Sequence, residues 1–244
     1  EVVNEDSSSN DVVEERKEES INKLNNESND KAGPLLQTFK TNYIFYITLL
    51  VCLFIISHYS NTSFIIAIIT IIYASMRGYF IHYISHLINY LNFYSGLDNY
   101  ITRNKILNPI LKFICKAVDF HDVVHHDSSI NKKISNIIYE FIMNFLTQGG
   151  LLIIAIYLLK KVNYSIIILW SLIYSTIHII NYEFVKPPTH MFHHLNKNTN
   201  YGLDVWDILF NTKYKSNNWQ VENINHGAIN IIVLTGIIVY FTKK

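Results

Sequence analysis

Long apolar runs separated by short polar segments dominate the pattern of this chain. They cover about residues 43–57, 64–82, 137–159 and 164–184. A helix rises 1.5 Å per residue, so about 20 apolar residues cross a hydrocarbon core of about 30 Å. Only residues 58–62 separate the first two runs and residues 160–163 the last two. The sequence therefore predicts an all-α integral membrane bundle of about four transmembrane helices in two hairpins.

Three further segments add to this pattern. Residues 228–241 are apolar but short, so a re-entrant piece, an interfacial helix and a short span all stay open. Residues 92–119 mix apolar side chains with lysines, which predicts a helix in the headgroup region. The third run carries Glu140, Asn144 and Gln148 at i+4 spacing. This polar stripe lines either an internal polar site or a hydrogen-bonded seam between helices, and we weigh the two equally.

Charge divides the chain into two parts. Residues 1–33 contain ten acidic and four basic residues, and the remainder contains nine acidic and sixteen basic residues. The acidic segment has too few apolar side chains to offset the entropy cost of folding. We therefore expect a disordered acidic tail in residues 1–40, losing its acidic character near Gly33-Pro34, and a membrane-embedded catalytic domain in residues 41–244.

Basic residues also indicate how the bundle is oriented. Eleven lie on the side where the histidines gather, against Lys160 and Lys161 in the opposite turns. Because loops rich in lysine and arginine stay in the cytosol, the histidine side is predicted to be cytosolic. The eleven are Lys40, Arg103, Lys105, Lys112, Lys116, Lys132, Lys133, Lys186, Lys197, Lys213 and Lys215.

Histidines form three short boxes, HxxxH, HxxxHH and HxxHH, with one more near the end of the fourth apolar run. Imidazoles at i, i+3 and i+4 share a helical face, and neutral imidazole nitrogen is a common metal ligand. One four-coordinate ion cannot use so many ligands, so two ions are expected, with iron and zinc as candidates. The candidate ligands are His82, His86, His121, His125, His126, His178, His190, His193 and His194.

Single histidines carry less weight than the boxes. His178 alone is compatible with a buried structural histidine, although its depth near the same membrane face favours a ligand. His226 lacks a partner at helical spacing, and we consider it less suited to be a tenth ligand. His58 lies in the far turn and is expected to be interfacial.

The boxes are followed by Asn200-Tyr201-Gly202 and by Trp-Asp-x-Leu-Phe-x-Thr in residues 206–212. In these motifs, over about residues 63–215, the chain resembles the fatty acid hydroxylase superfamily, which includes sterol desaturases, sterol methyl oxidases and sphingolipid hydroxylases. The resemblance implies a multi-pass enzyme of the endoplasmic reticulum membrane with a cytosolic histidine-rich cap. It also implies a di-iron centre, in which zinc can substitute, that uses O2 and electrons from cytochrome b5 and its reductase.

The same resemblance implies hydroxylation, or alternatively desaturation, at an unactivated C–H bond of a fatty acyl, sphingolipid or sterol substrate. This sequence departs from the family pattern in two places. Tyr182 stands where several members have a histidine, so nine ligands, or completion by water or His226, stay open. The segment between the first two boxes differs from that of the sterol enzymes, which leaves the lipid open. Positions beside the ligands or along a channel are expected for Glu140, Asn144, Trp170 and Tyr174.

Two other functional classes compete with a lipid oxidase. A metal transporter would need a histidine relay near the middle of the bilayer, whereas most of these histidines lie at one face. A zinc hydrolase would need a general base beside a metal-bound water. The expected partners are the membrane, a lipid substrate and an electron donor such as cytochrome b5, with no nucleic acid.

Overall fold

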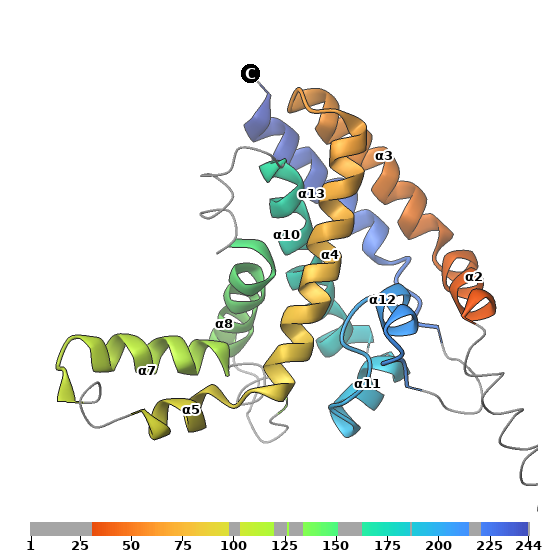
Figure 1. The fold of residues 1–244 in the computed structure, drawn as a ribbon. Helices are drawn as coiled ribbons and strands as arrows, with labels where there is room; N and C mark the ends of the chain where they lie inside the picture. The colour runs from red at the N-terminus through yellow and green to blue at the C-terminus, as the bar shows by residue number, and fades with distance from the viewer. Residues whose placement is uncertain are drawn as a thin grey trace, which may run out of the picture.

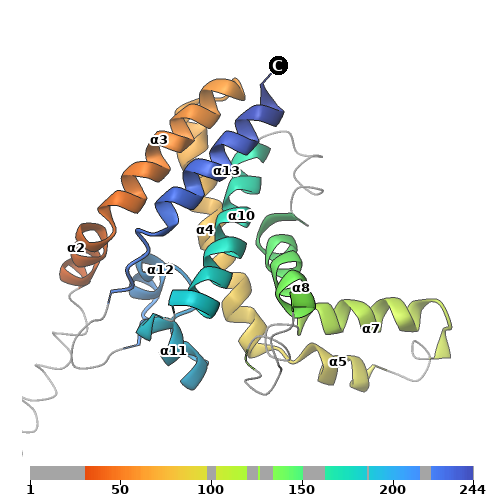
Figure 2. The ribbon, with the colours of Figure 1, turned by 180° about the vertical axis from the view of Figure 1, so that it is seen from behind.

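The structure is a computed structural model, and its bundle consists of four helices. They are α3 (Tyr43–Tyr59), α4 (Phe64–Leu87), α10 (Tyr164–Ile180) and α13 (Gly227–Thr242). Each packs against at least two of the others, and they run side by side in both views (Figures 1 and 2). Secondary structure is helical without strands in the described residues, which confirms the all-α prediction. The described residues are 31–97, 103–119, 126, 134–150, 163–185, 187–214 and 221–243.

Apolar side chains from all four helices form the core. Phe45 of α3 and Ala67 of α4 are fully buried, as are Ile166 of α10 and Ile231 of α13. Helix α13 packs against both α3 and α10. The short apolar segment that the sequence left open is thus a helix of the bundle, because its partners supply the burial that its length alone did not specify.

The outward faces of the bundle are apolar as well. Ile65 and Ile69 of α4 and Ile229 of α13 are 68%, 60% and 73% exposed. A contiguous apolar surface of this kind is unusual for a protein surrounded by water. Among the described helices α4 is long and apolar enough to cross a membrane, and α2 (Ala32–Thr41) with α3 passes the same test as a pair bent by 74°. The four-span arrangement stays a prediction.

Helix α2 lies where the sequence indicated the end of the tail. Residues 1–30 are outside the described residues, whereas α2 includes most of residues 31–40. Pro34 is tolerated in its first turn, where no intrahelical N–H bond is lost. Lys31 donates from Nζ to the Leu209 carbonyl at 2.9 Å, at the end of α12 (Asp204–Leu209). Contact with α12 therefore orders a segment whose composition alone resembled the tail.

The remaining elements follow the predicted runs with breaks. Helix α8 (Ile134–Phe145) continues into the π-helix η2 (Leu146–Gly150), and α10 continues into the π-helix η3 (Asn181–Val185). Residues 151–162, which would close the second predicted hairpin, lie outside the described residues. The predicted headgroup helix is two helices, α5 (Tyr90–Gly96) and α7 (Leu107–Val118), which pack together and extend sideways from the bundle (Figure 1).

The polar stripe of the third run divides between its two expected roles. Glu140 and Gln148 are both buried, 5% and 2% exposed. Gln148 accepts from Trp170 Nε1 at 3.3 Å and donates to the Gly78 carbonyl at 3.5 Å. A Cβ at Gly78 would overlap the Gln148 side-chain oxygen, so a larger residue there would force this amide to shift. Gln148 belongs to a seam between helices, whereas Glu140 lies beside His178 at the other end of the stripe.

Candidate metal centre

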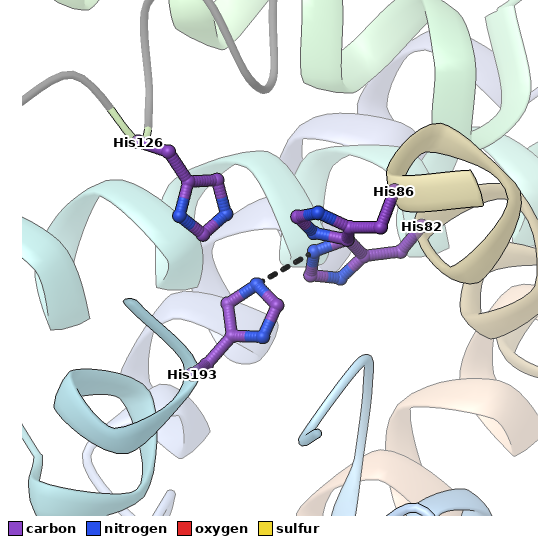
Figure 3. Close-up of side chains that lie close together, drawn as sticks. All are labelled: His82, His86, His126 and His193. Atoms are coloured by element: carbon purple, nitrogen blue, oxygen red, sulfur yellow. Dashed lines mark hydrogen bonds between the residues drawn. The ribbon is translucent and has the colours of Figure 1, made fainter. Parts of the chain in front are cut away.

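Four histidines that are distant in sequence meet at one end of the bundle (Figure 3). His82 and His86 project from the last turns of α4, and His193 projects from α11 (Pro188–Leu195). His126 lies between α7 and α8. One ring nitrogen of each lies within 4.8 Å of the others. The structure thus joins members of all three predicted boxes in one cluster.

Backbone carbonyls fix the orientation of two of these rings. His82 Nδ1 lies 2.6 Å from the Tyr201 carbonyl, and His193 Nδ1 lies 2.5 Å from the Thr199 carbonyl. Because a carbonyl oxygen only accepts, each Nδ1 carries the proton in the neutral ring, and each Nε2 carries a lone pair. The two Nε2 atoms face each other at 3.1 Å. Two lone pairs at this distance repel each other unless both point at a cation.

Burial keeps the cluster in the form that binds metal. It lowers the pKa of His193 from 6.5 to about 3, and neighbouring histidines add to this effect. The pKa of His126 is lowered for the same reasons. Both rings are therefore neutral at physiological pH, as metal ligation requires. Around a tetrahedral ion with 2.0–2.1 Å bonds, ligand nitrogens lie roughly 3.3–3.4 Å apart, so the donor set fits a metal ion.

A second group of histidines adjoins this cluster. His190 Nε2 and His194 Nε2 lie 3.1 Å apart. The His178 ring lies 5.3 Å from the His190 ring, and the His126 ring lies 4.5 Å from the His194 ring, measured between centroids. These contacts place His178, His190 and His194 directly beside the four-histidine cluster. All the predicted ligands that the structure describes therefore belong to one continuous group.

The other histidine predictions have different outcomes. His121 and His125 lie outside the described residues, as does the side chain of Tyr182. His226 precedes α13, and no ring contact joins it to a box histidine within the described part of the chain. His58 is exposed near the end of α3, as expected.

The cap consists of α11, which carries the third box, and the loop and helix α12 that follow it. It is held in place by side chains with no metal-binding character. Asn200 adopts φ = 57°, a left-handed conformation that asparagine tolerates. Its Nδ2 donates to the Thr189 carbonyl at 3.0 Å, and its Oδ1 accepts from the Tyr214 amide at 3.0 Å. Trp206 Nε1 donates to Ser75 Oγ at 3.2 Å. These bonds hold the cap against α4 and α11.

Asp207 anchors the loop that orients His82. It is fully buried and accepts from the amides of Tyr201 and Gly202 at 2.8 and 3.0 Å. It also accepts from Thr212 Oγ1 at 2.8 Å. Asp207 thus accepts from the backbone amide of Tyr201, and the backbone carbonyl of Tyr201 accepts from His82. The sequence showed Asp207 within a motif, but only the fold gives it this role.

Glu140 lies beside His178, with 3.4 Å between Oε1 and Nε2. A carboxylate next to one ring nitrogen orients the imidazole and leaves the other nitrogen for metal. Tyr174 stacks on the opposite side of this contact, 5.5 Å from the His178 ring. The expectation that Glu140 and Tyr174 lie beside the ligands agrees with these contacts. Asn144, one helical turn beyond Glu140, is buried with no partner for its Nδ2 among the described residues.

We expect Glu140→Ala to lower metal affinity about 10- to 100-fold, the range typical of carboxylates that orient a ligating histidine. Competition with a chelator, followed by metal analysis, measures the change. Ile138→Ala is the matched control, because Ile138 is 54% exposed on the same helix. Equal affinity in the two variants would show that Glu140 gives the site no support.

A cavity of about 100 Å³ adjoins the second group of histidines. His82, His178 and His190 reach its wall, and Trp170 and Tyr174 line it as the sequence suggested. Apolar side chains of α3 and α10, including Phe45, Ile173 and Ile177, line it as well. The cavity is smaller than the 300–1,000 Å³ of a site that encloses a whole ligand, so it suits one end of a longer molecule.

Glu222 joins four segments at the wall of this cavity. Its carboxylate accepts from Asn181 Nδ2 at 2.6 Å and from Thr189 Oγ1 at 3.0 Å. Its amide donates to Asp204 Oδ2 at 2.8 Å, and its carbonyl accepts from Asn42 Nδ2 at 2.8 Å. No spacing or motif in the sequence singled out Glu222. Only the fold brings η3, α11, α12 and the start of α3 to this residue.

This carboxyl makes stability depend on pH. Burial, with the neighbouring Asp204 charge, raises the pKa of Glu222 from 4.5 to about 7. The folded state holds this proton more tightly than the unfolded state does. Glu222 therefore stabilises the fold fully below pH 4.5, and this stabilisation is lost as pH rises through 7. We expect the free energy of unfolding to fall by at most about 3 kcal/mol from this source, and Glu222→Gln to remove that slope. Denaturant titrations at several pH values measure it; equal slopes in both proteins would contradict it.

Comparison with known proteins agrees with this geometry. Residues 111–212 match a family model described as fatty acid hydroxylase. The matched stretch is a fatty acid hydroxylase domain, which belongs to the fatty acid hydroxylase/sterol desaturase superfamily. Proteins of this family are typically metal-dependent, membrane-associated oxidoreductases. Searches of curated proteins and of solved structures found no match. His82, His86 and Glu222 lie outside the matched residues, and the fold brings them to the same site.

Proposed function

We propose that this protein is a membrane-bound, O2-dependent lipid hydroxylase with a histidine-ligated di-iron centre. The carrying observation is the pair of Nε2 atoms of His82 and His193, aimed at each other within a buried four-histidine cluster. The match of residues 111–212 to the fatty acid hydroxylase family supports a lipid hydroxylase or desaturase.

The first ion is assigned to His82, His86, His126 and His193. The second is assigned to His178, His190 and His194. His121 and His125, which lie outside the described residues, stay predicted ligands from the sequence. Imidazole ligands suit iron and zinc alike, and the family's oxidoreductase class favours iron. Bound iron supplies the O2 activation needed to break an unactivated C–H bond.

The residues of this chain supply positioning and a dry environment. The carbonyls of Tyr201 and Thr199 hold the rings of His82 and His193 with Nε2 directed inward. Phe45, Ile173 and Ile177 give the adjoining cavity an apolar wall. Such a wall aligns an alkyl chain beside the histidines and excludes water from it.

The cellular setting follows from charge and from the family. The excess of lysine and arginine on the histidine side supports a cytosolic centre. We assign the protein to the endoplasmic reticulum membrane as a multi-pass enzyme with cytochrome b5 or a similar protein as electron donor. The apolar outer faces of α3, α4 and α13 support membrane insertion.

Desaturation on the same scaffold is the alternative, since it begins at the same C–H bond and differs only in the loss of a second hydrogen. A zinc hydrolase is less favoured, because the matched family is one of oxidoreductases and the carboxylate beside the group, Glu140, contacts His178 in an orienting role. A transporter is also less favoured, because the clustered histidines come mainly from the last turns of α4 and from α11. These segments lie at one end of the bundle (Figure 1).

Lipid analysis of cells with and without the protein tests the proposal. We expect a product carrying a new hydroxyl group, formed only with O2, and two iron ions per purified chain. A new double bond instead would identify a desaturase. Turnover without O2, or one metal ion or none after iron supply, would overturn the proposal.

A further inference from the structure

One end of the cavity beside the second histidine group is polar. Asn181, Thr189 and Glu222 line it there, with Asp204 and Asn42 next to them. Asp204 forms an ion pair with Lys213, so its charge is compensated. Among the described residues, the side-chain donors to the Glu222 carboxylate are the neutral groups of Asn181 and Thr189. In the described part of the chain, this end of the cavity therefore presents oxygen acceptors and no uncompensated side-chain cation.

Asn181 presents an acceptor that the protein does not use. Its Nδ2 faces the Glu222 carboxyl at 2.6 Å. Above pH 7 this group is ionised and can only accept, so Oδ1 is the amide atom that is left without a partner. The side chain is 6% exposed, and its Oδ1 has no hydrogen-bond partner among the described residues. A buried carbonyl oxygen without a donor is unfavourable, because it has lost its hydrogen bond to water. A ligand with a hydrogen-bond donor would replace that bond.

The polar end also lies next to the reactive centre. Asn181 follows His178 by three positions, and residues with this spacing on a helix have Cβ atoms about 5–6 Å apart. Thr189 directly precedes His190. A few carbon atoms span such a distance, so a group bound at Asn181 would hold the first carbons of its chain against the histidines.

We propose that Asn181 and Glu222 form a subsite for a hydrogen-bond-donating, non-anionic lipid headgroup, namely a hydroxyl or an amine. Oxidation then falls on the carbons next to that group rather than in the middle of the chain. The inference rests on the proposed function, and it deepens that function by naming the substrate class.

Three ligands with the same C18 chain separate the headgroup chemistries. Octadecanol, octadecylamine and stearate compete for the iron-loaded protein in phosphatidylcholine nanodiscs. We expect the alcohol and the amine to bind about tenfold more tightly than stearate, since both can donate to Asn181 Oδ1 whereas the carboxylate meets another carboxylate. Oxidised carbons are located by mass spectrometry and are expected within the first few positions of the chain.

Two variants and one control test the named residues. Asn181→Leu should weaken the alcohol and the amine about five- to tenfold, the loss of one hydrogen bond. Glu222→Gln should weaken only the amine, because the charge is lost while the shape is kept. Thr235→Val is the control. Thr235 is also buried with an unpartnered Oγ1 among the described residues, but it faces a separate groove between α3 and α13.

Metal content is measured in every variant, so that a damaged centre is recognised. Equal binding of stearate and octadecanol, or octadecanol binding that Asn181→Leu leaves unchanged, would overturn the subsite. If Asn181→Leu does not fold, Glu222→Gln still tests the subsite. Weaker binding of octadecanol as well as octadecylamine in Glu222→Gln would overturn it. O2-dependent oxidation of stearate alone would overturn the subsite and leave the proposed function standing. Selective binding without any oxidation would support the subsite and overturn the proposed function.

Discussion

Replacing His193 with alanine is expected to remove metal from the four-histidine cluster and to lower lipid product more than about a hundredfold. This exceeds the 10- to 100-fold typical for residues that only orient a ligand. His193 is fully buried, and its Nε2 lies 3.1 Å from that of His82. Its ring also lies 5.0 and 4.9 Å from those of His86 and His126. No other residue described at this site lies as close to all three partners.

Metal analysis of the purified variant and mass spectrometry of its lipid products measure the two effects. His58→Ala is the matched control, because His58 is exposed and distant from the boxes. His193→Asn separates ligation from folding, since an amide can still donate to the Thr199 carbonyl. If His193→Ala keeps both its metal and its product, the cluster is not the catalytic centre.

Asp207→Ala is expected to destabilise the protein by about 3–5 kcal/mol, the range for breaking a buried network, and to weaken metal binding as well. Two backbone amides and one hydroxyl would lose their acceptor in a fully buried place. The loop at Tyr201 would then no longer hold its carbonyl against His82. Asp207→Asn keeps part of the acceptor capacity, so a smaller effect is expected.

Thermal unfolding and metal titration of the same preparations measure both consequences. Asn198→Ala is a suitable control, because Asn198 is exposed in the same loop. Loss of stability with unchanged metal affinity would show that the Tyr201 carbonyl does not orient His82. Unchanged stability would contradict the anchoring role itself.

The helices could be read from the sequence to different degrees. Helix α4 follows its apolar run because 24 residues of this composition are long enough to specify a helix. Residues 228–241 left three alternatives, since a short apolar segment takes its role from whatever it packs against. Its packing on α3 and α10 decided the outcome. Helix α2 went unnoticed because its order depends on contact with α12.

Some features of the candidate site could be predicted from the sequence, and others could not. Histidine spacing singled out the candidate ligands, because i, i+3 and i+4 positions share a helical face whatever the fold. The same spacing could not show which boxes share an ion, since His82 and His193 are separated by 111 positions. The carbonyls of Thr199 and Tyr201 were hidden for another reason, because every residue has a carbonyl and only its placement makes it a partner.

By itself, the sequence determined an all-helical chain rich in apolar runs, a set of candidate histidine ligands and a resemblance to the fatty acid hydroxylase family. These are local properties of composition and spacing, and they persist in any arrangement of the helices. The tertiary structure alone decided that His126 joins His82, His86 and His193, that Asp207 supports this cluster, and that Asn181 and Glu222 line the neighbouring cavity. Such contacts depend on long-range packing, which no short window of sequence encodes.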